Sequence, residues 1–302
     1  MELTNDAGKE SRKNEFHRSV MCGEIVDFLN PSRGGVYVDA TAGGGGHSKG
    51  LLEHGATRVV ALDMDGEALA YIGHNLACFA ERLSLHFFNF RNLDEVLSEE
   101  GIEGIEGVVF DLGLSWHQVR SSERGFSYQG DGLLDMRFDS ESNARTALEI
   151  IRSEPVSAIT KILKEYGEER RAHVIAREIV ANRGRIKTTA DLAELLKRTV
   201  GPKNFRKTAM RVFQALRIAV NDELENLEKG IDAACDHLNL KGRIAVLSYH
   251  SLEDRIVKRA FAEKESSGSF SRVTRKPVYA SEEEVRDNPA ARSAKLRVLE
   301  RV

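Results

Sequence analysis

Short apolar segments alternate with amphipathic segments through the first third of the chain. Apolar, β-branched runs are typical of buried parallel strands, whereas apolar residues spaced three or four positions apart indicate helices. Because strands and helices alternate, the pattern predicts right-handed βαβ units and an open parallel sheet. The expected strands are 35–40, 58–63, 83–88 and 107–111, and the expected helices between them are 48–54, 67–81 and 93–99.

The pattern changes after the fourth expected strand. Residues 112–139 are rich in Gly, Ser and Asp, which indicates a loop, and a long region of helical periodicity follows. Strand-like spacing returns at 243–248 and more weakly at 272–274 and 296–299, and the acidic segment 282–289 is expected to be an exposed loop. The expected helices of the middle region are 146–152, 156–166, 168–182, 190–200 and 208–238.

The simplest organisation is an α/β fold in which a Rossmann-like, doubly wound sheet is interrupted by an all-helical insertion. We expect the insertion at 115–207, so that 1–114 and 208–302 together form the sheet domain. A chain of 302 residues is long enough to build two such domains. In folds of this kind, ligands bind outside the carboxyl ends of the strands.

The composition is that of an ordinary globular protein, with 41% hydrophobic and 30% charged residues. No apolar stretch approaches the roughly 18 residues of a membrane-spanning helix. The N-terminal residues are polar and show no targeting pattern, so we expect a cytoplasmic protein without a membrane partner. Cys22, Cys78 and Cys235 lie far apart, which predicts neither disulfides nor a metal site.

Basic residues are concentrated in one part of the chain, although the net charge is −3. Between residues 170 and 217 the sequence has thirteen Lys and Arg residues and only three acidic ones. A solvated helical face is the usual explanation of such a run, but this excess favours contact with RNA phosphates. The candidates nearest to the return to the sheet are Arg206, Lys207, Arg211 and Arg217.

A glycine-rich turn follows the first expected strand, in the sequence Asp39-Ala-Thr-Ala-Gly-Gly-Gly-Gly-His47. A dinucleotide fingerprint fails, because Ser48 or Lys49 occupies its third glycine position, and no Gly-Lys-Ser/Thr of a phosphate-binding loop is present. Asp63 ends the second strand, about where a ribose-binding carboxylate lies in such folds. This layout favours S-adenosylmethionine (SAM), which has a ribose and no phosphate. A tight turn without ligand, and a capping or surface role for Asp63, are the alternatives.

Several long motifs stand out along the sequence. They are His17-x-Ser-Val20, Asp39-Ala-Thr-Ala-Gly-Gly-Gly-Gly-His47, Asp111-Leu-Gly-Leu-Ser115, Glu123-Arg-Gly-Phe-Ser127, Leu134-Asp-Met-Arg137, Tyr166-Gly-Glu-Glu169, Phe213-Gln-Ala-Leu-Arg217, Ser248-Tyr-His-Ser-Leu-Glu-Asp-Arg255 and Asn288-Pro-Ala-Ala-Arg-Ser293. Together they resemble the RsmH (MraW) family over nearly the whole chain. The resemblance implies a SAM-dependent methyltransferase acting on the N4 atom of a cytosine in the decoding region of 16S ribosomal RNA.

The resemblance also implies a set of cofactor contacts. Gly45, Gly46 and His47 would line the methionine part of SAM, Asp63 the ribose and Phe90 the adenine, with Asp111 and Gln118 completing the pocket. The residue pattern alone agrees for the first four, but would treat Phe90 as an ordinary core aromatic. Family members usually have Ser-Ser-Pro-Gln where this chain has Ser115-Trp-His-Gln118. The missing proline removes a restriction on φ, so the contact through Gln118 is the least secure.

A cytosine amino group is a weak nucleophile, because its lone pair is delocalised into the ring. Positioning, and acceptors for the N–H groups, should therefore dominate catalysis. Asp111 is a candidate acceptor, with cofactor binding or loop ordering as alternatives, and the polar-Pro-Pro-aromatic segment of many amino-group methyltransferases is absent there. His250 is a candidate base contact or proton relay, or else makes a structural hydrogen bond. Trp116 is a candidate for base stacking, or packs in its loop.

Two other functional classes fit the same fold. A small-molecule methyltransferase would keep its activity when the basic region is neutralised, and a non-catalytic RNA-binding ribosome assembly factor would not bind SAM. The expected partner is 16S rRNA or the small ribosomal subunit, and not DNA. The sequence leaves the oligomeric state open, a homodimer included.

Overall fold

A computed structural model describes residues 19–114, 122–141 and 144–302 of the chain. The chain divides into two compact units, which we call the sheet unit (Met1–Trp116 and Glu228–Val302) and the helical unit (His117–Leu227). The insertion was expected at 115–207, and residue 207 lies inside the helix Pro202–Asn221. The apolar spacing of the sequence gives no sign of where the helical unit ends. Within the described ranges, no helix has both the length and the apolar character needed to cross a membrane.

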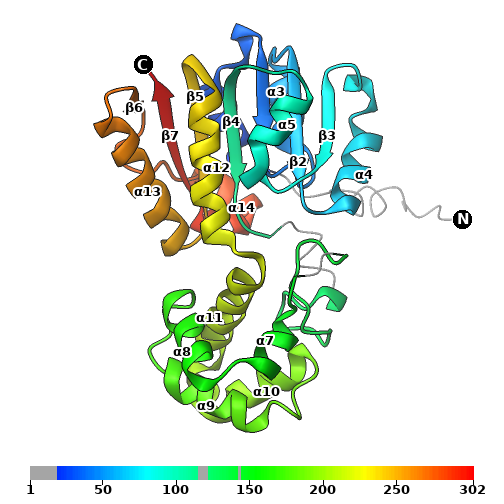
Figure 1. Cartoon of the computed structure of the whole chain (residues 1–302), viewed down its shortest axis with the longest axis vertical. Helices are drawn as coiled ribbons and strands as arrows, with labels where there is room; N and C mark the ends of the chain where they lie inside the picture. The colour runs from blue at the N-terminus through cyan, green and yellow to red at the C-terminus, as the bar shows by residue number, and fades with distance from the viewer. Residues whose placement is uncertain (1–18, 115–121, 142–143) are drawn as a thin grey trace, which may run out of the picture. The chain divides into compact units, whose positions relative to one another are not determined.

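The sheet unit contains a seven-stranded sheet in the order β3-β2-β1-β4-β5-β7-β6 (Figure 1). The first five strands are parallel, as expected, but β7 runs antiparallel between β5 and β6. The sequence predicted no direction for β6 and β7, since a short apolar run indicates a strand and not its direction. The strands are β1 Val36–Asp39, β2 Arg58–Asp63, β3 Leu83–Phe87, β4 Ile105–Asp111, β5 Leu238–Ser248, β6 Phe270–Arg272 and β7 Lys295–Arg301.

Alternate strand residues point to opposite faces of the sheet. Because these strands are apolar on both faces, helices pack against the sheet. Val59, Ala61 and Val109 belong to a buried cluster that includes residues of α2 and α3. Figure 1 shows α12 (yellow) and α13 (orange) alongside β5 and β7. The helices with residues in the sheet unit are α2 Cys22–Leu29, α3 Gly46–Glu53, α4 Gly66–Asn75, α5 Leu93–Glu99, α12 Glu223–His237, α13 Ser251–Ser266 and α14 Glu282–Asp287, with 3₁₀ turns η1 Pro31–Arg33, η2 Ala77–Phe79, η3 Phe90–Asn92 and η5 Pro289–Ser293.

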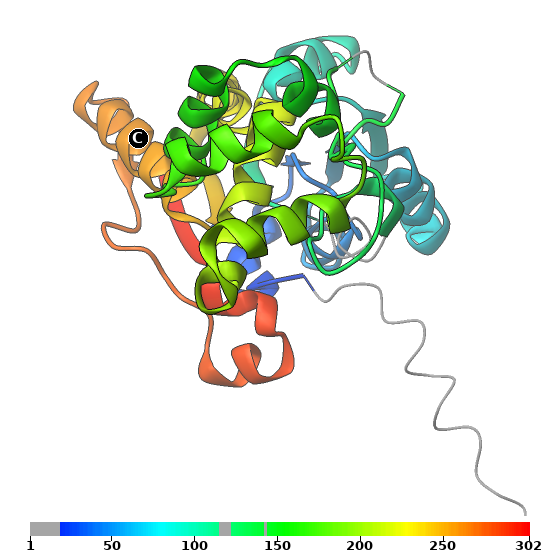
Figure 2. The same ribbon diagram turned by 90° about the horizontal axis from the view of Figure 1, so that it is seen from below.

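The acidic segment before the last strand is a helix, α14, and not the expected loop. The hydroxyl of Ser281 accepts a hydrogen bond from the Glu284 N–H at 3.1 Å and caps the helix. The Glu284 carboxylate accepts the Met21 N–H at 2.7 Å, which ties α14 to the start of α2. Figure 2 shows the orange-red α14 beside the blue α2. A helix of six residues is too short for apolar periodicity to indicate it.

The helical unit has its own apolar core, which includes Ile159, Ile179 and Leu216. Capping boxes begin α7 at Thr146 and α10 at Thr188. Its elements are η4 Ser122–Arg124, α7 Ala147–Ser153, α8 Val156–Glu165, α9 Ala172–Asn182, α10 Thr189–Val200 and α11 Pro202–Asn221.

The expected single helix 208–238 is two helices, α11 and α12. Asp222 separates them in a left-handed conformation with a φ of 50°, and its N–H caps the carbonyl of Ile218. Apolar spacing continues across this residue, so the pattern did not reveal the break.

Candidate functional site

The glycine-rich turn lies between β1 and α3 and is fixed by Asp39. This residue is fully buried, and one carboxylate oxygen accepts hydrogen bonds from the N–H and the hydroxyl of Ser48 at 3.0 and 2.7 Å. The other oxygen accepts the Thr41 N–H at 3.4 Å. Burial raises the pKa of Asp39. Its contacts are therefore structural: they join the end of β1 to the first turn of α3.

Gly45 is required at the end of this turn for two reasons. Its φ of 78° is left-handed, a conformation that side chains rarely adopt. A Cβ there would also lie 3.0 Å from Ile72 of α4. The turn is thus packed tightly on its inner side, which holds its backbone in one position.

Asp63 ends β2, as the sequence predicts, and β2 is the neighbour of β1. The side chain lies against the turn. Its two carboxylate oxygens accept the N–H groups of Gly43 at 2.7 Å and Asp65 at 2.9 Å. Burial raises the pKa of Asp63 to about 6, although the side chain keeps some contact with solvent. The carboxylate therefore titrates close to neutral pH.

Asp111 ends β4 on the other side of β1 and is the centre of a polar cluster. Its N–H donates to the Thr41 hydroxyl at 2.6 Å. One carboxylate oxygen accepts the Tyr249 hydroxyl at 2.6 Å, and the other lies 3.2 Å from Nε2 of His47. Tyr249 was not among the predicted site residues. The signal for it in the sequence is its position directly after β5, whose carboxyl end lies beside that of β4.

His47 carries a charge in this cluster. Its side chain is only 3% exposed, and burial by itself lowers the pKa. The hydrogen bond and charge of Asp111, with the charge of Asp39, outweigh that effect and raise the pKa to about 10. His47 is therefore an imidazolium at neutral pH that donates to Asp111, and it is not available as a base.

Phe90 follows β3 and is partly buried. Its ring packs edge-on against Phe110 with 5.5 Å between the centroids. Gly230 of α12 lies so close that a Cβ there would be 2.6 Å from the Phe90 ring. The ring is thus fixed near the carboxyl ends of the strands, and its contact with adenine stays a prediction.

His250 occupies the N-cap of α13. Its Nδ1 accepts the Glu253 N–H at 3.4 Å, and the Glu253 carboxylate in turn accepts the N–H groups of Tyr249 and His250 at 2.8 and 3.2 Å. The structural alternative for His250 is thus present, and a catalytic role stays a prediction. Trp116 and Gln118 lie outside the described residues.

The site therefore places two carboxylates around a glycine turn at one edge of the sheet. Asp63 and Asp111 flank the turn through β2 and β4, the two strands that pair with β1. Such a pair repels phosphate, and it accepts hydrogen bonds from hydroxyl groups and attracts cationic ligands. These acceptors fit a cofactor with ribose hydroxyls and a positive charge.

The comparisons with known proteins agree with this chemistry. The model of the MraW methylase family matches residues 14–302. The chain belongs to this family. It is 43% identical to the "Ribosomal RNA small subunit methyltransferase H" of Carboxydothermus hydrogenoformans, over 95% of this chain and 98% of that protein. It is 44% identical to the protein of the same name from Kosmotoga olearia, over 96% and 98% of the two chains.

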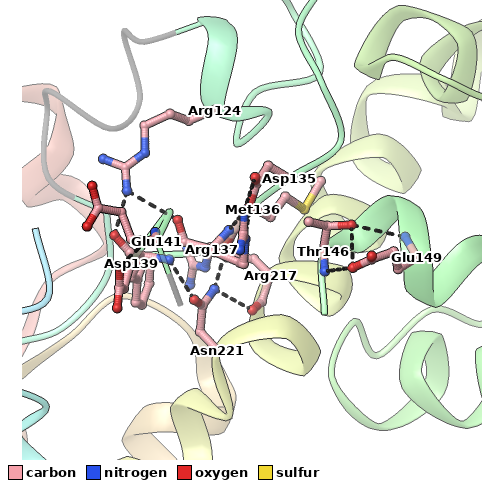
Figure 3. A network of polar contacts seen from close by, with 11 residues as sticks. Arg124, Asp135, Met136, Arg137, Asp139, Glu141, Thr146, Glu149, Arg217 and Asn221 are labelled. Carbon is pink, nitrogen blue, oxygen red and sulfur yellow. Dashed lines mark hydrogen bonds and ion pairs between the residues drawn. The ribbon is translucent and has the colours of Figure 1, made fainter. Parts of the chain in front are cut away.

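In this MraW methylase, a polar network orders the loop of the helical unit that precedes α7 (Figure 3). The Arg124 guanidinium donates to the carbonyls of Arg137 and Phe138 at 3.2 and 2.6 Å. The Asn221 side chain of α11 donates to the Met136 carbonyl at 2.7 Å and accepts the Phe138 N–H at 2.8 Å. Asn221 thus holds the segment 136–138 on α11, and Arg124 joins the same segment to η4.

The four basic residues that the sequence predicts as RNA contacts differ in whether their charge is paired. Arg217 makes two hydrogen bonds with the Glu223 carboxylate at 2.7 and 2.9 Å and is only 12% exposed, so its charge is neutralised. Arg211 faces Glu169 at 3.7 Å. Arg206 and Lys207 are exposed, with no ion pair in the part of the chain that the structure describes.

Three further exposed cations lie at the same turn between helices. Lys197 and Arg198 are in the last turn of α10, and Lys203 is in the first turn of α11, one glycine later. Between Glu194 and Asp222 the sequence has no acidic residue. The N-terminal end of α11 adds the positive end of its helix dipole. We call these five residues, Lys197, Arg198, Lys203, Arg206 and Lys207, the basic corner.

Proposed function

We propose that this MraW methylase transfers the methyl group of SAM to the exocyclic N4 of a cytosine in small-subunit ribosomal RNA. The observation that carries the proposal is the pair of carboxylates, Asp63 and Asp111, around the glycine turn of a chain that belongs to a methylase family. The names of the relatives support ribosomal RNA as the substrate.

The cofactor contacts follow from the positions of these groups. Asp63 would accept hydrogen bonds from the ribose hydroxyls, and the turn at Gly45 and Gly46 would face the methionine part with His47 behind it. Phe90 would lie beside the adenine. The bound SAM supplies an electrophilic methyl group on a cationic sulfur, and the negative charge of Asp63 favours that cation. The charge of Asp111 is offset in part by His47.

Asp111 is suited to accept a hydrogen bond from an amino group as well. A carboxylate has about four lone-pair positions. Tyr249 and His47 each use one, on different oxygens. The remaining positions can accept an N–H of the cytosine amine as positive charge develops on it, which stabilises the transition state electrostatically.

The basic corner would bind RNA phosphates. Each phosphate contact adds affinity that depends on salt and not on sequence. Arg206 and Lys207 keep the role that the sequence proposed, because they are exposed and unpaired within the described residues. Arg217 is not part of the basic corner, because its guanidinium is paired with Glu223.

The test is methyl transfer from labelled SAM to small ribosomal subunits that lack the modification, followed by nucleoside analysis. We expect label in N4-methylcytidine and its loss in Asp63→Ala. SAM binding with label in another nucleoside, or in none, would contradict the proposed substrate. Failure to bind SAM would contradict the cofactor and favour a non-catalytic RNA-binding protein.

A charge variant separates RNA recognition from cofactor binding. Replacing Lys203, Arg206 and Lys207 by Ala should leave SAM affinity unchanged and strongly reduce methylation of the subunit at 0.15 M salt. The matched control replaces Lys258, Arg275 and Lys276, three exposed cations of the sheet unit, and should retain activity. Equal activity of the two variants would mean that the basic corner does not bind the substrate, as expected for a small-molecule methyltransferase.

A further inference from the structure

Tyr249 connects two parts of the site that are far apart in the sequence. Its hydroxyl donates to an Asp111 carboxylate oxygen at 2.6 Å, and its own N–H is held by Glu253 of α13 at 2.8 Å. Burial, followed by the negative charge of Asp111, raises the pKa of Tyr249, so the phenol keeps its proton and remains a donor. The tyrosine is thus fixed at its backbone and at its hydroxyl.

The Tyr249 ring packs beside Gly113. Gly113 lies just after β4 with a φ of 110°, and a Cβ there would be 3.5 Å from the Tyr249 ring. The two strands that lead to this point are paired, with Asp111 opposite Leu247. The ring therefore reaches Asp111 across neighbouring strands of the sheet.

We propose that Tyr249 is a positioning residue that sets the orientation of the Asp111 carboxylate in the SAM site. The inference rests on the proposed function and goes beyond it, because it assigns a role to a residue that need not contact the cofactor. His47 and Tyr249 hold different oxygens of Asp111 from opposite elements, α3 and the end of β5. With both present, the carboxylate has one orientation, and its free lone pairs point to one place.

Removing the Tyr249 hydroxyl leaves Asp111 held by His47 on one oxygen alone. The carboxylate can then rotate about its Cβ–Cγ bond without loss of the fold, since the ring and the Glu253 contact remain. A hydrogen bond to a charged group contributes enough to change a binding constant by about 10- to 100-fold. We expect the dissociation constant for SAM to rise by that factor in Tyr249→Phe.

The matched control is Tyr37→Phe. Tyr37 is a fully buried tyrosine of the sheet unit, and its hydroxyl donates to the Asn30 carbonyl at 3.2 Å. Within the described residues, no hydrogen bond joins it to the site residues. It should change SAM affinity less than twofold. Both variants should show a similar, small decrease in melting temperature, so that a difference in SAM affinity does not reflect general destabilisation.

A double-mutant cycle shows whether Tyr249 acts through Asp111. SAM affinity is measured by titration calorimetry for the wild type, Tyr249→Phe, Asp111→Asn and the double variant. We expect Tyr249→Phe to have an effect of 10-fold or more in the wild-type background and less than threefold in the Asp111→Asn background. A merely structural tyrosine would give the same factor in both.

Three outcomes would overturn the inference. One is wild-type SAM affinity in Tyr249→Phe, and another is an equal effect in both backgrounds. The third is a loss of affinity that follows a fall in melting temperature much larger than that of Tyr37→Phe. Wild-type protein that binds no SAM would refute the proposed function as well, whereas normal wild-type binding with no coupling would refute this inference alone.

Discussion

Three aspartates end or follow neighbouring strands, and their surroundings give them different properties. Asp39 is fully buried and engaged by Ser48 and Thr41, so it supports the turn. Asp63 is bound by two backbone N–H groups and retains contact with solvent. Asp111 is paired with the His47 imidazolium and the Tyr249 hydroxyl. Residue type alone does not separate these roles; burial and hydrogen-bond partners do.

The raised pKa of Asp63 predicts a pH dependence of SAM binding. Burial puts this pKa at about 6 in the free protein. Ribose hydroxyls donate hydrogen bonds to the ionised carboxylate, so binding favours the deprotonated form. Affinity should be constant above about pH 7 and fall below pH 6, approaching tenfold per pH unit. Titration calorimetry between pH 5 and 8 measures it.

The control for this prediction is Asp63→Asn, which should bind more weakly and show no inflection near pH 6. His47, with a pKa of about 10, stays charged over this range and should not contribute. A wild-type affinity that is flat from pH 5 to 8 would show that Asp63 does not contact the cofactor through its ionised form.

How much of the site the sequence predicts depends on how local each contact is. Asp63 was predicted to end the second strand, and it does so beside the glycine turn, because parallel neighbouring strands end at the same edge. Its contact with the ribose stays a prediction. The ion pair of Arg217 with Glu223 was not predicted, since Glu223 lies beyond a left-handed residue that the pattern did not reveal. The contact of Tyr249 with Asp111 crosses 138 residues, and only the pairing of β4 with β5 brings them together.

Among the elements, strands and helices with clear boundaries matched their predictions. The bounds of β2 and α5 are those that the sequence indicates, because polar or turn residues flank both. Elements without clear boundary residues differ from their predictions. The helices α11 and α12 were predicted as one helix, and α14 was predicted as a loop. Apolar periodicity measures which face is buried, and it cannot detect a single left-handed residue such as Asp222.

The loop before α7 should depend on one side chain of α11. Asn221→Ala removes the two hydrogen bonds to the Met136 carbonyl and the Phe138 N–H. We expect a loss of about 1–3 kcal/mol in local stability, since buried backbone groups lose their partners. Hydrogen exchange of the Phe138 amide should accelerate by one to two orders of magnitude.

Asn182→Ala is the control for this change, because the Asn182 side chain makes only a local bond to the Glu178 carbonyl four residues earlier. It should leave exchange at Phe138 unaltered. Unchanged exchange at Phe138 in Asn221→Ala would show that the rest of the network, including Arg124, is sufficient to hold the loop.

At the scale of the whole molecule, the sheet unit and the helical unit have separate cores. We therefore expect SAM to stabilise the two units by different amounts. SAM at 100 times its dissociation constant adds about 2.7 kcal/mol to the stability of the part that binds it. The gain should appear as slower amide exchange in the strands of the sheet unit and much less in α8 and α9. Equal protection in both units would indicate that they unfold as one cooperative body.

The interruption of the sheet between β4 and β5 also sets an order of events during synthesis. Synthesis of the central strand β4, with Val108, Val109 and Phe110, is complete at residue 111. Its partner β5 begins only at residue 238. At a ribosomal rate of about 5–20 residues per second, the hydrogen-bonding edge of β4 waits roughly 6–25 s for that partner. The helical unit is contiguous in sequence and can complete its core within this interval. The nascent chain thus carries an open apolar edge for many seconds, and this makes the half-made sheet, rather than the finished protein, the form most exposed to aggregation.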